Sequence, residues 1–181
     1  GHGKHVYENV LRIPLSITWP AAIEPGTIDS STLITDVAVT LLALAGVPAN
    51  DGFAGINWSP VLRGEQPATD GRVTFFQGHR GAVDPVEDPT DLRRKGLLEV
   101  GRLEGRRKEI IVVNKGTRQI FDVIADPGEV RNLVAPDSPP SAELVEWLGT
   151  VQEWLARAED EPPPKISDED AERLRALGYI E

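Results

Sequence analysis

The residues best suited to chemistry stand at the start of the chain. Residues 1–14 contain two of the three histidines, His2 and His5, together with Lys4. Glycines at positions 1 and 3 permit positive φ, so this loop can bring His2 and Lys4 close to a ligand. A lysine offers three donors and a positive charge, and a histidine can donate a proton near neutral pH. This pair is therefore predicted to bind an anion or to protonate a leaving group.

Plainer explanations fit the same stretch. A Gly-His opening is also typical of the remnant of a purification tag or of a mobile chain end. A metal site is the weakest interpretation, because His2 and His5 have no third ligand nearby and the chain contains no cysteine. A closed tetrahedral site cannot be assembled from these residues.

A second pair of candidates follows a predicted strand. Residues 72–77 contain Val73, Phe75 and Phe76, which favour a strand, and His79 and Arg80 come directly after it. Loops at strand ends often carry function, so these two side chains are candidates for substrate binding. The alternative is ordinary surface polarity.

The elements that must position these residues can be predicted along the chain. A buried strand is expected at residues 15–19, and a helix beginning at Ser31 or Asp36 and ending at Ala45. Further strands are expected at residues 97–102, 109–114 and 118–124, the last two joined by a hairpin turn at 114–117. A helix should begin at Ser141 after two prolines, and a short final helix near Ser167.

Composition excludes several classes of function. The 181 residues are enough for about one domain, and the net charge of −10 argues against general nucleic-acid binding. No apolar run reaches the ~18 residues that a membrane span requires. Without cysteine there are no disulfides. Residues 93–108 are an exception to the acidic charge of the chain, because they contain two acidic and seven basic residues. The basic residues of this run are Arg93, Arg94, Lys95, Arg102, Arg106, Arg107 and Lys108. The run predicts either a polyanion-binding patch or a solvated hairpin edge.

Four segments resemble sulfatases in the order in which that family carries them. Residues 1–15 (GHGKHVYENVLRIPL) are similar to its Gly-His-Gly or Gly-Lys-Gly, Tyr-Glu and Arg-Val-Pro stretch. Residues 35–46 (TDVAVTLLALAG) resemble Asp-x-x-Pro-Thr-Leu-Leu-x-x-Ala-Gly, with Val39 in place of the usual proline. Residues 55–64 (GINWSPVLRG) and 120–133 (IFDVIADPGEVRNL) resemble its Gly-x-Ser-Leu-x-Pro-x-Leu-x-Gly and Leu-Tyr-Asp-Leu-x-x-Asp-Pro-x-Glu-x-x-Asn-Leu segments.

The resemblance implies the C-terminal part of a sulfatase of the alkaline-phosphatase-like superfamily, without the N-terminal nucleophile and metal-ligand region. It implies an α/β fold: the end of a sulfatase-type mixed sheet with a helix, then a small antiparallel sheet packed on a C-terminal helix. The corresponding divisions are residues 1–70, the end of the catalytic domain; residues 71–160, the sheet and helix subdomain; and residues 161–181, a proline-rich linker and a short docking helix.

The resemblance also implies the chemistry. The parent protein would hydrolyse the sulfate ester of a small molecule or glycan, using Ca²⁺ and a formylglycine, neither of them bound by this segment. The N-terminal portion of the same domain would be its partner, and the isolated segment is expected to be inactive. His2, between two glycines, is the first choice for binding a sulfate oxygen or protonating the leaving alcohol, Lys4 the second, and His5 a poorer one.

Other functions remain open from the sequence. Phosphodiester and phosphonate hydrolases of the same superfamily share this half of the chain. A non-catalytic interaction module is the second alternative, because nucleophile and metal ligands are lacking. The third is a polyanion binder that uses the basic run.

Overall fold

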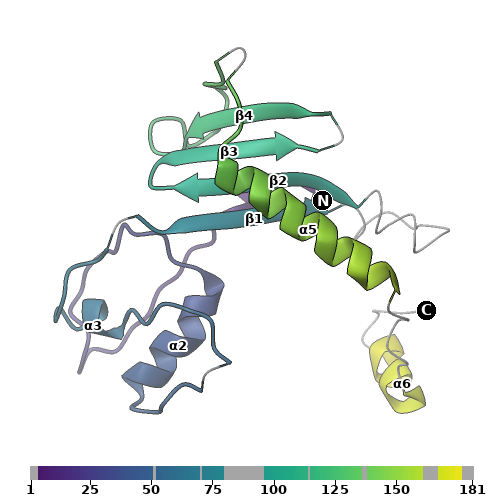
Figure 1. The fold of residues 1–181 in the computed structure, drawn as a ribbon. Helices are drawn as coiled ribbons and strands as arrows, with labels where there is room; N and C mark the ends of the chain where they lie inside the picture. Colours follow the sequence, from purple (N-terminus) through teal and green to yellow (C-terminus); the bar gives the residue numbers. More distant parts are fainter. Residues whose placement is uncertain are drawn as a thin grey trace.

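The computed structural model describes residues 4–50, 52–69, 71–79, 96–113, 115–135, 138–160 and 167–176. These residues form two lobes (Figure 1). The sheet lobe, residues 71–160, holds a four-stranded sheet crossed by a long helix. The α2–α3 lobe, residues 13–69, lies beyond one edge of that sheet. A short helix, α6 (Asp168–Ala176), lies apart from the sheet.

The sheet is an antiparallel meander in the order β1-β2-β3-β4. Its strands are β1 (Val73–His79), β2 (Leu97–Glu104), β3 (Arg107–Val112) and β4 (Thr117–Asp122). Glycines make the two tight turns, because Gly105 (φ 56°) and Gly116 (φ 60°) adopt the left-handed conformation that hairpin turns require. The predicted α/β architecture, with a small antiparallel sheet and helices, is confirmed.

Each face of the sheet carries its own apolar cluster, as strand alternation requires. On one face α5 (Ala142–Asp160) packs Leu144 and Val151 against Leu97 and Val100. On the other face Ile110 and Phe121 pack against Val6 of the N-terminal segment, which we define as residues 4–12. This segment contains one turn of helix, α1 (Glu8–Leu11). The N-terminal segment therefore takes the place that a second covering helix would occupy.

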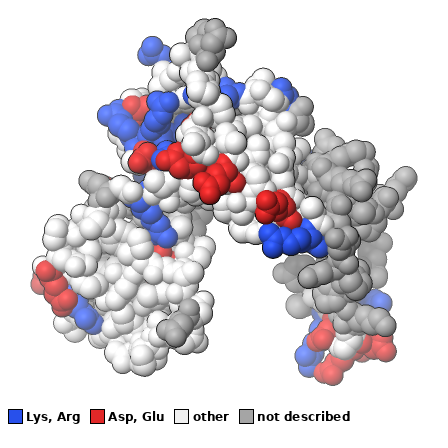
Figure 2. Space-filling view, in the orientation of Figure 1, with Lys and Arg blue, Asp and Glu red and all other residues white. Residues whose placement is uncertain are grey.

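The α2–α3 lobe contains two helices, α2 (Ile34–Leu44) and α3 (Ser59–Leu62). Of its large apolar side chains, Leu44 and Trp58 are buried. More of them are exposed: Ile13, Leu15, Trp19, Ile34, Leu41, Val47, Phe53 and Ile56. Space-filling atoms show this lobe mostly uncharged, with charged side chains gathered over the sheet (Figure 2).

Several sequence-based expectations need correction. Residues 15–19 form no strand, and Leu15 is 51% exposed, because no described segment pairs with them. The first long helix begins at neither candidate cap but at Ile34, after Leu33. Asp36 lies in the first turn of this helix and accepts a hydrogen bond from Leu33 N–H. A residue of the helix itself thus provides an acceptor for a backbone N–H group at the helix start. Strands β2 and β3 extend further toward their shared turn than predicted.

Candidate functional site

The N-terminal segment lies directly on the sheet at two glycines. A Cβ atom at position 78 would lie 3.1 Å from the carbonyl oxygen of Lys4, and one at position 101 would lie 3.1 Å from Cγ2 of Val6. Both distances are shorter than ordinary van der Waals contacts, so a side chain at either position would push the segment away. The two glycines therefore let the backbone beside Lys4 approach β1 and β2.

Glu99 of β2 clamps the same part of the segment. This nearly buried carboxylate accepts a hydrogen bond from Val6 N–H (3.0 Å) and contacts Nδ1 of His5 (3.1 Å). An ionised carboxylate can only accept, so Nδ1 of His5 carries the proton in this contact. His5 itself is 55% exposed at the side chain, with its ring held at the edge that meets Glu99.

A buried lysine fixes the next part of the segment. Lys108 of β3 is completely buried, and its Nζ lies 3.0 Å from Oε1 of Glu8 and 3.0 Å from Oε1 of Glu129. Glu129 also accepts a hydrogen bond from Glu8 N–H (2.5 Å) and adopts φ 49°, uncommon for a residue other than glycine. The ammonium also lies 5.8 Å from the ring centroid of Phe76. Three chain regions thus meet around one buried charge.

Tyr7 completes the docking of the segment. Its hydroxyl donates to Oε1 of Gln119 on β4 (2.6 Å), and its ring meets Phe121 edge to face. Burial raises the pKa of Tyr7, and the nearby carboxylates of Glu99 and Glu129 add to this, against the hydrogen bond to Gln119, which lowers it. The hydroxyl is therefore a structural donor at neutral pH.

The predicted site residues are placed as follows. Lys4 is half-buried at the start of the described segment, and its backbone lies against Gly78. His79, one residue further along β1, pairs with Leu97 across an irregularity at Gly78 and His79. Leu97 belongs to the cluster beneath α5, so alternation directs the His79 side chain toward that face, opposite Lys4. Burial lowers the pKa of His79, which favours its neutral form. His2 and Arg80 lie outside the described residues.

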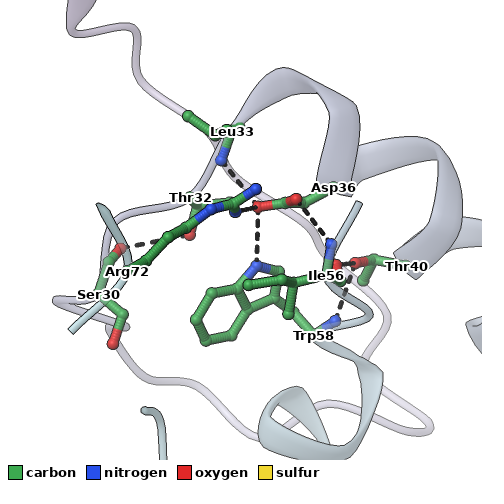
Figure 3. A network of polar contacts seen from close by, with 8 residues as sticks. All are labelled: Ser30, Thr32, Leu33, Asp36, Thr40, Ile56, Trp58 and Arg72. Atoms are coloured by element: carbon green, nitrogen blue, oxygen red, sulfur yellow. Dashed lines mark hydrogen bonds and ion pairs between the residues drawn. The ribbon is translucent and has the colours of Figure 1, made fainter. Parts of the chain in front are cut away.

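A second polar network organises the α2–α3 lobe (Figure 3). The fully buried carboxylate of Asp36 accepts hydrogen bonds from Leu33 N–H (2.8 Å), Ile56 N–H (2.8 Å) and Trp58 Nε1 (3.1 Å). It also pairs with the guanidinium of Arg72, which immediately precedes β1. Burial alone would raise the pKa of Asp36, but these donors outweigh it and lower the pKa below its ordinary 3.8.

The basic run is not a continuous surface patch. Arg102 is nearly buried, donates to Glu104 (2.8 Å) and lies 3.7 Å from Glu143 of α5. Lys108 is the buried ammonium described above. Both sequence-based predictions for the run, a polyanion-binding patch and a solvated hairpin edge, are therefore wrong for Arg102 and Lys108. Arg106 is exposed and paired with Asp122 (2.5 Å). Arg93, Arg94 and Lys95 lie outside the described residues. Among the described residues of the run, Arg106 and Arg107 are the exposed ones.

Sequence reasoning missed Glu99, Lys108 and Glu129 as the residues that hold the candidate site. Each acts on a partner about a hundred positions away in sequence, and no local pattern signals such a contact. One signal was present: Lys108 stands two positions before Ile110 in a strand, so both side chains belong to the same face of the sheet. A lysine on the face that carries core residues is a candidate for burial.

The chain was compared with known protein families and structures. Residues 2–90 match a family model of the C-terminal region of a sulfatase, which confirms the predicted resemblance over this part of the chain. The family is described as N-sulphoglucosamine sulphohydrolase, C-terminal. The matched stretch includes the N-terminal segment, the α2–α3 lobe and β1. No curated protein matches the chain.

Solved structures with a similar arrangement include several sulfatases. A 2-O GAG sulfatase shares 25% identity with a TM-score of 0.43, over 69% of this chain and 25% of the other. A structure from work on glycosaminoglycan metabolism by Bacteroides thetaiotaomicron shares 19% identity with a TM-score of 0.48, over 88% of this chain and 32% of the other. The phosphonate monoester hydrolase of Agrobacterium radiobacter shares 22% identity with a TM-score of 0.42, over 73% and 26%. The chain thus spans about a quarter to a third of these structures.

Proposed function

We propose that this chain forms the C-terminal part of an enzyme that hydrolyses sulfate esters, with a sulfated sugar as the substrate class. The observation that carries the proposal is the family match over residues 2–90, whose description names a sulphohydrolase of N-sulphoglucosamine, a sugar with its sulfate on nitrogen. The family match supports the class of sulfate-removing hydrolases and a sulfated sugar, and the ester bond is our proposal. The structure adds a physical reason to look at the N-terminal segment: contacts from all four strands and from Glu129 fix its backbone beside Lys4. A cationic group must be held in this way to stabilise charge that develops in a transition state.

The roles proposed for the predicted residues follow from their chemistry. Lys4 supplies a point charge for a sulfate oxygen, and His2 binds a second oxygen or protonates the leaving alcohol. The sequence placed His79 on a loop, but it is the last residue of β1 and faces the other side of the sheet, so it is assigned only the weaker role of contacting the substrate. Replacing His2 with alanine should therefore lower turnover much more than replacing His79 with alanine. Equal small losses would remove His2 from the mechanism.

Calcium and formylglycine belong to the proposal only as groups of the parent protein. No cluster of three or more His, Cys, Asp or Glu side chains suited to a metal ion occurs within the described parts of the chain. The sequence contains no cysteine and no Cys/Ser-x-Pro-x-Arg motif from which formylglycine would be made. The described residues therefore offer no such cluster for a calcium ion, and the proposed roles of Lys4 and His2 do not depend on contact with either group.

The exposed apolar side chains of the α2–α3 lobe support the same interpretation. Eight of its large apolar side chains are exposed and two are buried, so much of its apolar surface is left for another part of the protein to cover. We assign that surface to the N-terminal portion of the same catalytic domain. None of the described helices is both long and apolar enough to cross a membrane.

The experiment is a substrate comparison on the complete protein that contains this sequence. Hydrolysis of 4-nitrophenyl sulfate and of a sulfated glucosamine is measured beside bis(4-nitrophenyl) phosphate and a phosphonate monoester. We expect the sulfates to be the better substrates, and the isolated 181-residue chain to be inactive. Preference for the phosphorus esters would support a phosphodiester or phosphonate hydrolase instead. No turnover of any ester would favour the interaction module.

A further inference from the structure

The geometry points to His5, held by Glu99, as the proton donor to the leaving alcohol. This inference rests on the proposed sulfate-ester hydrolysis, assigns the proton transfer to the histidine that sequence reasoning ranked lowest, and leaves to His2 the other proposed role, binding of a sulfate oxygen. It makes Glu99 a positioning residue, because the carboxylate acts on the reaction only through the imidazole ring.

The first step concerns the orientation of the ring. Glu99 contacts Nδ1 of His5 at 3.1 Å and anchors the adjacent backbone through Val6 N–H at 3.0 Å. One nearly buried carboxylate thus fixes both the ring and the chain that carries it. A carboxylate on Nδ1 selects the tautomer with its proton there and leaves Nε2 as the nitrogen that does not face Glu99.

The second step concerns the other ring nitrogen. Within the described residues Nε2 of His5 has no hydrogen-bond partner, and the side chain is 55% exposed. Nε2 is therefore the end of the ring available to a substrate. The neighbouring residue is Lys4, whose backbone is fixed against Gly78. A sulfate ester bound by Lys4, the residue next to His5 in the chain, is the group that we propose meets Nε2.

The proposed proton transfer is as follows. As a new bond forms between sulfur and an oxygen nucleophile, the bond between sulfur and the ester oxygen breaks and its electron pair stays on that oxygen. The proton on Nε2 of the imidazolium moves to the ester oxygen, so a neutral alcohol leaves. His5 becomes neutral, with its remaining proton on Nδ1 toward Glu99.

The kinetic test uses the complete protein and two aryl sulfates that differ in the leaving group. 4-Nitrophenolate leaves readily without a proton, whereas 4-methoxyphenolate requires one. For His5→Ala we expect kcat/KM to fall about 10²-fold or more with 4-methoxyphenyl sulfate and less than about tenfold with 4-nitrophenyl sulfate. Equal losses on the two substrates, or no loss on either, would overturn the assignment.

A second readout is independent of turnover. With ¹⁵N confined to histidine, the ring nitrogen shifts of His5 report which nitrogen carries the proton, the signal being identified by its loss in His5→Gln. We expect the neutral ring of the native protein to be the Nδ1–H tautomer, so that Nε2 is the nitrogen that takes up a proton and then donates it. Glu99→Gln keeps the acceptor for Val6 N–H but presents an amide donor to the ring, so it should reverse the tautomer and lower kcat on the methoxy substrate with little change in KM. An unchanged tautomer would contradict the role of Glu99.

The matched control is Tyr7→Phe, which removes the hydrogen bond to Gln119 from the same segment without touching the His5–Glu99 contact. It should leave both the tautomer and the ratio between the two substrates unchanged. If Tyr7→Phe reproduces the His5→Ala pattern, the effect is loosening of the segment and the assignment fails. If the native protein cleaves neither sulfate, the proposed function fails, while the tautomer still decides whether Glu99 orients His5.

Discussion

The two lobes of this molecule are stabilised in different ways. In the sheet lobe, eight of the described apolar side chains are buried: Leu97, Val100, Ile110, Ile120, Phe121, Val123, Leu144 and Val151. In the α2–α3 lobe the corresponding residues are Leu44 and Trp58. The smaller apolar core of the second lobe is accompanied by the Asp36 network, in which one carboxylate joins the start of α2, the loop before α3 and Arg72.

The difference shows where each lobe is vulnerable. An apolar cluster distributes its contribution over many contacts, so losing one weakens it in part. A buried carboxylate with four donors concentrates the contribution, because its removal leaves every donor without an acceptor. The α2–α3 lobe should therefore respond to a single polar substitution in a way that the sheet does not. The following changes test that contrast.

The largest effect is expected from Asp36→Ala. This change leaves Arg72, Trp58 Nε1 and two backbone N–H groups without their acceptor, and removing one partner of a buried ion pair costs about 3–5 kcal/mol. Native-state hydrogen exchange should show faster exchange at the amides of Ile56 and Trp58, with the β2 and β3 amides little affected. Glu65→Ala, an exposed carboxylate of the same lobe, is the control. Equal loss of protection in the sheet would show that the lobes unfold as one unit.

A smaller and differently located effect is expected from Lys108→Met. It leaves Glu8 and Glu129 facing one another without the ammonium, but methionine fills much of the same space and either carboxyl can take up a proton. Limited proteolysis should detect release of the N-terminal segment while circular dichroism shows the sheet retained. Arg107→Met, at the neighbouring exposed position, is the matched control. A protein that loses the whole sheet would show that the apolar clusters do not sustain this lobe.

The smallest effect is a change in acid sensitivity. The pKa of Asp36 is lowered below 3.8 in the folded protein, so its contribution to stability is complete above that pH and is lost as pH falls through the lower, folded value. Thermal melts between about pH 5 and pH 2, with the indole N–H NMR signal of Trp58 as the probe, should show a steep decline of the α2–α3 lobe in the native protein. Asp36→Asn should be less stable at neutral pH but flatter in this window. If the stability of the native protein and that of Asp36→Asn fall equally steeply with decreasing pH, carboxylates other than Asp36 cause the loss of stability in acid.

Much of the secondary structure could be predicted from local patterns. The alternating strands of the meander, the glycines at its turns and the helix after Ser141 follow from residue types a few positions apart. The failures share a cause. Residues 15–19 have the composition of a buried strand, but whether a strand forms depends on a neighbour that composition does not specify. Lys108 and Arg102 looked like solvated charges because their carboxylate partners, Glu8, Glu129 and Glu143, come from distant segments.

The candidate site shows the same division. The cationic residues near the start of the chain could be recognised by type and by resemblance. The residues that hold them could not, since Glu99 meets His5 across 94 positions and Lys108 meets Glu8 across 100. The motif gave His5 a low rank among the candidates. Its proposed role depends on the contact between Nδ1 and Glu99, and that contact forms only in the folded chain.

The buried ammonium of Lys108 also sets the register of the N-terminal segment. Sliding this segment by one residue along the sheet would move Glu8 away from Lys108, so the buried ammonium would lose one of the two carboxylates that it pairs with and keep Glu129. Insertions or deletions between Lys4 and Glu8 would then change the reach of the cationic residues without changing their anchor. The four positions between Lys4 and Glu8 thus form a spacer of fixed length. This spacer sets how far Lys4 can reach from the point where Glu8 is anchored.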